Sequence, residues 1–286
     1  MTRVDERAGA LPVPRGTRRS TRARVQGRFP VLLWVPAGLG LAFLVLPLAA
    51  LVVRAPWAAL VAIFADPETR AALALSLGTA TAATVGSIAL GVPLALVLAR
   101  SHFPGRRLVR TLVTVPVVLP PVVGGVALLL AYGRTGVVGQ YLELWFGVSI
   151  PFTTLAVVVA QTFVAMPFLV LALDGALATV DDSLAEAAAT LGASRLHIFV
   201  HVTLPTLAPA LLAGAVLCWA RALGEFGATI TFAGNFPGST QTMPLAVYLA
   251  LQSDPDAAVA LSLVLLAVAV LVLTLLRDRW LRGVVR

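Results

Sequence analysis

Residues 181–209, DDSLAEAAATLGASRLHIFVHVTLPTLAP, form the long polar interruption between apolar segments that still has a helical pattern. Ser183 precedes Glu186 by three residues, a spacing typical of a capping box, so we predict a helix that begins near Leu184. The helix should continue through the three following alanines and end at Gly192, because glycine readily adopts the left-handed conformation that closes a helix. This helix is therefore short.

A second helical segment follows directly in the same stretch. Ser194 is placed to cap it, and its apolar positions are Leu196, Ile198, Phe199 and Val202. Pro205 should exclude Leu204 from helix, because the residue before a proline is disfavoured in the α conformation. The sequence thus predicts two short helices joined at an angle, followed by a separate apolar span.

The composition is that of a membrane protein. Hydrophobic residues make up 59% of the 286 and charged residues only 12%, which excludes an ordinary soluble domain. Six segments without any charged residue are each long enough to cross a hydrocarbon core as a helix. They are 31–53, 71–99, 111–132, 150–173, 202–220 and 257–276. We therefore predict an all-α polytopic protein with six transmembrane helices.

The basic residues exclude one class of function, that of a P-loop ATPase. All 21 are arginine, and a P-loop ATPase needs a lysine on the nucleotide phosphates, so any ATP must be hydrolysed by another subunit. The chain has one cysteine, Cys218, so it forms no internal disulfide. Nothing in the sequence calls for a cofactor.

Residues 1–28 hold eight arginines and lack apolar periodicity, so we expect a disordered tail. Orientation of the chain and attraction to anionic lipid explain this tail better than nucleic-acid binding does. The first apolar segment is too long for a signal peptide and should remain as an uncleaved helix.

The distribution of arginine predicts the topology. With the N-terminus inside, six spans place 17 arginines in the cytoplasm and only Arg54, Arg70 and Arg134 outside, with Arg221 at the end of a span. This asymmetry predicts that both termini and residues 181–209 are cytoplasmic.

Proline and glycine interrupt the third span near its middle. Pro120 and Pro121, followed by Gly124 and Gly125, should break or bend the helix there. Two interpretations remain open: a hinge or pathway wall, or a bend that improves packing. The small residues of 78–83 and 86–91 should form a face for close helix contact.

Two charged residues directly follow the apolar sequence of the fifth span. Arg221 and Glu225 are four residues apart, so they can pair on one helix face. Ionisable groups at such depth usually face a polar cavity, so we predict that they line a translocation pathway together with Thr229 and Thr231. The alternative is an ion pair that fixes the end of the helix.

Other polar residues suggest no catalytic or metal site. His197 and His201 have a metal-ligand spacing but no third ligand nearby, so we predict no metal. Asp181 and Asp182 precede a helix, and their negative charges there are explained by a favourable interaction with the positive end of the helix dipole. No serine lies in a nucleophile elbow, and the charge-free spans argue against a membrane-embedded enzyme.

The spacing in residues 181–209 resembles the EAA signature of binding-protein-dependent ABC importer permeases: Glu186-Ala187-Ala188, then Gly192, then VTLP ending at Pro205. The resemblance implies the type I importer permease fold and a coupling helix that docks on a separate cytoplasmic ATPase. It assigns that coupling to Ser183, Glu186, Ala187, Ala188, Gly192, Leu204 and Pro205. Val202 stands where the family prefers isoleucine, which is a conservative change.

A second stretch, LGEFGATITFAGN at residues 223–235 followed by QTMPLAVY, resembles the molybdate branch of these permeases, with sulfate permeases as close relatives. The resemblance covers residues 70–276. It implies a non-enzymatic permease for an oxyanion, with molybdate as the expected substrate and sulfate or tungstate as alternatives. The rival from another class is an ion-coupled secondary transporter.

These inferences predict the organisation of the chain and its partners. The segments are a tail at 1–28, a first transmembrane helix at 29–54, a transmembrane domain at 70–277 with a coupling loop at 176–206, and a cytoplasmic tail at 278–286. The expected partners are an ABC ATPase, an extracytoplasmic substrate-binding protein, a second copy of the chain and membrane lipid. Nucleic acid is not expected, and the location should be the cytoplasmic membrane.

Overall fold

The computed structural model of the chain describes residues 33–180 and 183–284, and these form helices and connecting loops without any strand. The predicted tail at 1–28 and the two aspartates at 181–182 lie outside the described residues. The chain divides into two units, 1–48 and 49–286, and each is considered by itself. Within its described part, the first unit consists of the larger portion of helix α1 (Trp34–Val53). The predicted all-α class is confirmed.

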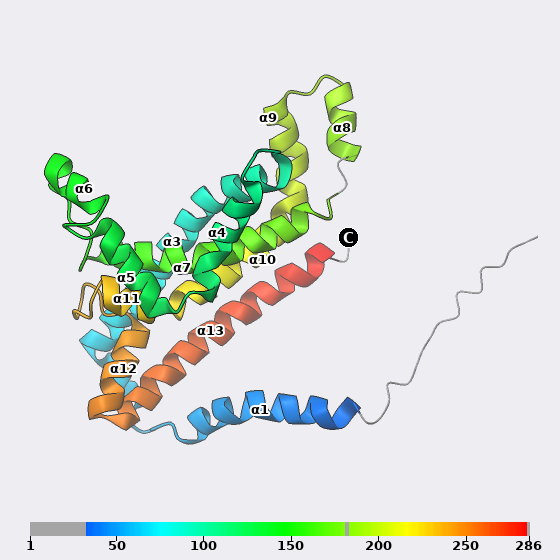
Figure 1. Ribbon diagram of the computed structural model, residues 1–286. Helices are drawn as coiled ribbons and strands as arrows, with labels where there is room; N and C mark the ends of the chain where they lie inside the picture. Colours follow the sequence, from blue (N-terminus) through cyan, green and yellow to red (C-terminus); the bar gives the residue numbers. More distant parts are fainter. Residues whose placement is uncertain (1–32, 181–182, 285–286) are drawn as a thin grey trace, which may run out of the picture. The chain divides into compact units, whose positions relative to one another are not determined.

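The second unit contains the remaining helices (Figure 1). In chain order they are α2 (Leu60–Ala65), α3 (Pro67–Arg100), α4 (Arg106–Val118), α5 (Pro121–Tyr132), α6 (Gly139–Phe146), α7 (Thr154–Leu177), α8 (Ser183–Thr190), α9 (Arg195–Ile198), the π-helical turn η2 (Phe199–Thr203), α10 (Leu204–Leu223), α11 (Gly227–Phe232), α12 (Met243–Ser253) and α13 (Pro255–Val284). Each predicted span therefore corresponds to a helix or to a pair of helices.

Five helices of the described chain are long and apolar enough to cross a membrane, and a sixth crossing requires α4 and α5 to count as one bent span. These two helices meet at a bend of 119°. Leu119 and Pro120 have extended backbones there, because each precedes a proline. The predicted break in the third span is confirmed.

Helix α3 is the longest transmembrane element, with 34 residues. Its start is determined locally, because the Asp66 side chain accepts a hydrogen bond of 2.8 Å from the backbone N–H of Thr69 and Pro67 occupies the first turn. Pro93 lies inside the helix without ending it. A helix of this length measures about 51 Å, so it exceeds a hydrocarbon core of about 30 Å.

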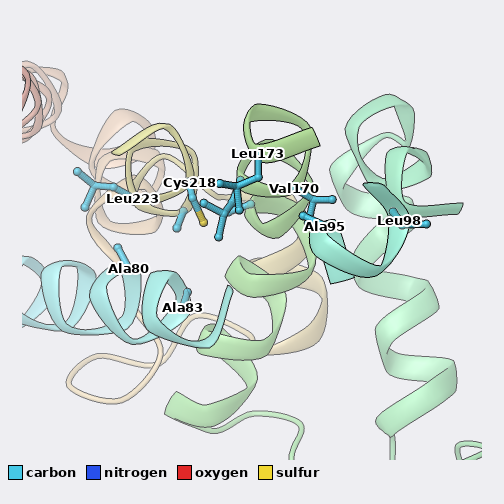
Figure 2. Close-up of a cluster of buried hydrophobic side chains, with 11 residues drawn as sticks. Ala80, Ala83, Ala95, Leu98, Val170, Leu173, Cys218 and Leu223 are labelled. Atoms are coloured by element: carbon cyan, nitrogen blue, oxygen red, sulfur yellow. The ribbon is translucent and has the colours of Figure 1, made fainter. Parts of the chain in front are cut away.

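The main core is formed by α3, α7 and α10, with small side chains where the helices meet (Figure 2). Its buried members include Ala80, Ala83, Ala95 and Leu98 from α3, Leu169, Val170 and Leu173 from α7, and Cys218, Ala222 and Leu223 from α10. A Cβ atom built on Gly91 would lie 3.2 Å from Cγ2 of Val170, and one on Gly214 would lie 2.9 Å from Cδ1 of Leu169. The alanines and these two glycines therefore permit close packing, whereas Gly78 faces open space.

Two ends of this unit are defined by contacts between distant segments. At one end, the N–H of Met243 in α12 donates to Oγ of Ser76 in α3 at 2.7 Å, and Oγ1 of Thr154 in α7 donates to the carbonyl of Ser239 at 2.8 Å. At the other end, Arg110 of α4 pairs with Asp174 of α7 at 2.6 Å. Helix α8 follows α7 at this second end, which we call the loop end.

Candidate functional sites

Helix α8 exposes most of its surface at the loop end. It begins at Ser183, next to the predicted start, and ends at Thr190, and none of its residues is buried. Glu186 and Ala187 are exposed, and Ala188 is half-buried. Leu191, directly after the helix, has 88% of its surface exposed. Leu184 in the first turn is 65% exposed, so apolar side chains are accessible at both ends of the helix.

The end of α8 is a Schellman motif around Gly192. The N–H of Ala193 donates to the carbonyl of Ala188, and the N–H of Gly192 donates to the carbonyl of Ala189, both at 3.0 Å. Gly192 has φ +85°, in the left-handed region, as the spacing predicts. The turn that follows directs the chain from α8 into α9.

The segment after this turn differs from the prediction. Ser194 caps α9 as expected, accepting a hydrogen bond from the N–H of His197 at 3.3 Å. Helix α9, the π turn and α10 then form one continuous helix, Arg195–Leu223. The predicted exclusion of Leu204 from helix is therefore wrong.

The π turn explains why the proline does not interrupt this helix. Pro205 lies in the first turn of α10, where the missing N–H is tolerated because the preceding π-helical turn has a different hydrogen-bond pattern. Leu204 is half-buried and Pro205 is exposed. The second predicted short helix is thus the beginning of a membrane-spanning helix.

Helix α8 lies beside the end of α3. A cavity of about 450 Å³ separates them, lined by Ala99, Arg100, His102, Ala185, Glu186, Ala189 and Ile198. Glu186, which the EAA-like spacing singles out, therefore lies near a basic helix end as well as on an exposed surface. The loop is positioned by the transmembrane helices on which it rests.

Arg221 and Glu225 form an ion pair at the opposite end of the continuous helix. Nη1 of Arg221 lies 2.6 Å from Oε2 of Glu225, and the two side chains are 28% and 1% exposed. Oε1 of the same carboxylate accepts a hydrogen bond from the N–H of Ala228 at 2.8 Å. Glu225 therefore connects the end of α10 to the first turn of α11, while Arg221 keeps a partly accessible guanidinium.

The hydroxyl groups near this pair are engaged mainly with backbone. Oγ1 of Thr231 donates to the carbonyl of Gly227 at 2.8 Å, and Oγ1 of Thr240 accepts from the N–H of Phe236 at 2.9 Å. Thr229 is fully buried, and its Oγ1 has no hydrogen-bond partner among the described residues. Thr229 and Thr231 thus lie on α11, the helix whose first turn donates the N–H of Ala228 to the Glu225 carboxylate.

Helices α5 and α11 approach each other through glycines, a contact that the sequence alone did not indicate. A Cβ atom on Gly125 would lie 2.7 Å from Cβ of Thr231, and one on Gly227 would lie 2.8 Å from Cβ of Pro121. The Pro-Pro and Gly-Gly pairs predicted a bend in the third span, but they did not indicate that the bent segment packs against α11. The bent span therefore packs directly against the element that carries the predicted pathway residues.

The two loop histidines stack on one helix face. The rings of His197 and His201 have centroids 4.1 Å apart, and Nδ1 of His201 lies 3.1 Å from the carbonyl oxygen of His197. Within residues 33–180 and 183–284, no group of three potential metal ligands occurs.

The known proteins that this chain resembles are permease components of transport systems. The family model described as the binding-protein-dependent transport system inner membrane component matches residues 91–286. The molybdenum transport system permease protein ModB of Mycobacterium tuberculosis is 51% identical and covers 80% of this chain and 87% of its own. ModB of Escherichia coli is 41% identical over 78% of this chain and 97% of its own. The sulfate transport system permease protein CysT of Salmonella typhimurium is 38% identical, with coverages of 73% and 76%.

Solved structures share the architecture. A bacterial ABC transporter involved in the import of the acidic polysaccharide alginate superimposes with a TM-score of 0.69 at 18% identity, over 88% of this chain and 94% of its own. The methionine ABC transporter MetNI gives a TM-score of 0.58 at 20% identity, over 75% and 95%. The predicted importer permease fold is confirmed.

Proposed function

The chain belongs to the family of binding-protein-dependent transport system inner membrane components, and on that premise we propose that it is the permease subunit of an ATP-driven importer of molybdate. It is a transport subunit and not an enzyme, because its relatives are permeases and ATP hydrolysis belongs to a separate subunit. The observation that carries the proposal is the exposed α8 helix with its left-handed Gly192 cap.

Coupling to the ATPase is assigned to the loop end. Exposed Glu186, Ala187 and Leu191 offer a surface for the ATPase, and the Schellman turn holds this surface at a set angle to the following helix. Ser183, Ala188 and Gly192 form the helix and its end, while Leu204 and Pro205 lie where the loop continues into α10. Movement of the docked helix would therefore act on the membrane-spanning core.

The substrate is a tetrahedral oxyanion, and relatives named for molybdenum transport favour molybdate over sulfate. A dianion cannot cross bare hydrocarbon, so its path must offer polar groups. Arg221 beside Glu225 gives a moderated positive field, which suits an anion that must bind and leave again. Thr229 and Thr231 lie on α11, whose first turn is bound by Glu225, and we assign them to the same pathway.

The assembly follows from the single coupling loop in each chain. ABC ATPases act in pairs, so we expect two permease chains, two ATPases and one external substrate-binding protein, in the cytoplasmic membrane with both permease termini inside. Mass measurement of the detergent-extracted complex tests this. A complex with one permease chain and two ATPases would refute the homodimer.

The decisive experiment is ATPase stimulation in a reconstituted complex. The permease, its ATPase and the binding protein are placed in proteoliposomes, and hydrolysis is measured with molybdate, tungstate and sulfate. Stimulation by molybdate, with sulfate weaker, supports the proposal. Strong stimulation by sulfate alone would reassign the substrate, and oxyanion uptake without a copurifying ATPase would favour the ion-coupled transporter.

A further inference from the structure

A basic cavity lies at the loop end, outside the coupling helix and the proposed pathway. It has a volume of about 600 Å³ and is lined by His102, Phe103, Pro104, Gly105, Arg106, Arg107 and Arg110. The lining contains three arginines and no carboxylate. We propose that this cavity binds the phosphate of an anionic phospholipid.

Two of the arginines are held by the protein itself. Nη2 of Arg106 donates to the carbonyl of Ala99 at 3.2 Å, and Nη2 of Arg110 pairs with Asp174 at 2.6 Å. A guanidinium has five N–H donors, so each arginine keeps donors for a ligand. The Arg110 side chain is still 47% exposed despite its ion pair. The cavity is thus partly organised before any phosphate binds.

Arg107 is the third arginine and differs from the other two. Its side chain is exposed and makes no hydrogen bond or ion pair within the described residues. Among the carboxylates of residues 33–180 and 183–284, Asp174 alone pairs with one of the three arginines, so a net positive charge remains. A phosphodiester complements that charge and offers the acceptor oxygens that arginine binds best.

The position of the cavity favours a lipid as the source of this phosphate. It follows directly after α3, whose length of about 51 Å exceeds a hydrocarbon core of about 30 Å, so the end of the helix can reach the headgroup region. Leu108, Leu112 and Val115 continue from the cavity along α4 at spacings of four and three residues. All three are exposed and share one helix face, which suits an acyl chain lying alongside.

The test is native mass spectrometry of the detergent-solubilised permease–ATPase complex, titrated with phosphatidylglycerol, phosphatidylcholine or sodium phosphate. A series at one residue, Arg107→Lys, Arg107→Gln and Arg107→Glu, varies charge without removing any contact that the protein makes. The control is Arg70→Gln, an exposed arginine in the first turns of α3 at the opposite end. Because lipid binding is measured directly, the result does not depend on whether molybdate is the substrate.

We expect phosphatidylglycerol to bind the wild type, the lysine variant and the Arg70→Gln control with similar affinity. One arginine near an anionic lipid contributes about fivefold, so Arg107→Gln should weaken binding about fivefold and Arg107→Glu about 25-fold. Phosphatidylcholine should bind more weakly throughout.

Three results would overturn the proposal. Equal losses in Arg107→Gln and Arg70→Gln would indicate general charge attraction without a site. Sodium phosphate competing as effectively as the lipid would make the ligand a soluble oxyanion. Loss of the ATPase from Arg107→Glu, with phosphatidylglycerol binding unchanged, would make this surface a protein interface.

Discussion

Replacement of Gly192 by valine tests the coupling helix most directly. The residue has φ +85°, and a Cβ atom added there meets nothing within 4 Å, so the substitution creates no clash. Its cost is conformational: a side chain in the left-handed region costs about 1–2 kcal/mol, and a β-branched one lies at or above the upper part of that range. This energy corresponds to about a 5–30-fold shift in the population of the turn.

The strain introduced by Gly192→Val should change the orientation of α8 more than the stability of the folded protein. Helix α8 has no buried residue, so its movement removes little core packing. We therefore expect Gly192→Val to insert in the membrane and keep the melting temperature of the wild type, while uptake and substrate-stimulated ATP hydrolysis fall about 5–30-fold. Uptake into proteoliposomes, measured together with ATP hydrolysis, tests this.

Gly147 provides a matched control. It follows the eight-residue helix α6, has φ +65°, and likewise leaves an added Cβ in open space. Gly147→Val therefore introduces the same kind of strain away from the loop end and should leave coupling near the wild-type level. Normal transport by Gly192→Val, or equal losses in both variants, would refute the assigned role of this turn.

Three further substitutions test packing, electrostatics and the pathway. Gly125→Ala places a methyl group against the backbone of α11 and should destabilise the protein by about 1–3 kcal/mol, whereas Gly78→Ala, in open space, should not; thermal unfolding compares them. Arg110→Ala removes a partly exposed pair with Asp174, worth about 0.5–1 kcal/mol, so the melting temperature should fall by about 1–3 °C and by less in high salt. Arg221→Gln removes the cation beside a buried carboxylate, and a barrier raised by about 1.4 kcal/mol would slow molybdate and tungstate uptake about tenfold alike. A changed ratio of the two rates would mean that the permease itself selects the substrate.

Local features of the fold were predictable because their causes are local. The Gly192 cap follows from the length of one helix and the conformational freedom of glycine. The bend at Pro120 and Pro121 follows from the restriction that proline places on the residue before it. Charge-free segments likewise identified the spanning helices, because the length and apolar character that allow a segment to cross the membrane belong to that segment alone.

The rest depended on information that is not local. Pro205 indicated a helix break, but a π-helical turn, which single residues do not reveal, lets the helix continue. The contact between Gly125 and α11 joins segments about 100 residues apart, so only the tertiary structure identifies it. For the same reason, the sequence could not show that Thr231 directs its hydroxyl to the carbonyl of Gly227.

The π turn at Phe199–Thr203 also determines the rotational phase between the two ends of the Arg195–Leu223 helix. Each α-helical residue advances the chain by about 100°, and a π turn accommodates one extra residue within the helix. Deleting one residue from this turn would allow it to become regular α-helix while leaving the facing direction of Arg221 nearly unchanged relative to the loop. An insertion in the regular part of α10 would instead rotate Arg221 by about 100° away from its present side. A one-residue deletion therefore preserves the direction in which Arg221 faces, relative to the loop, when it is made in the π turn. A one-residue change in the regular part of the helix alters that direction.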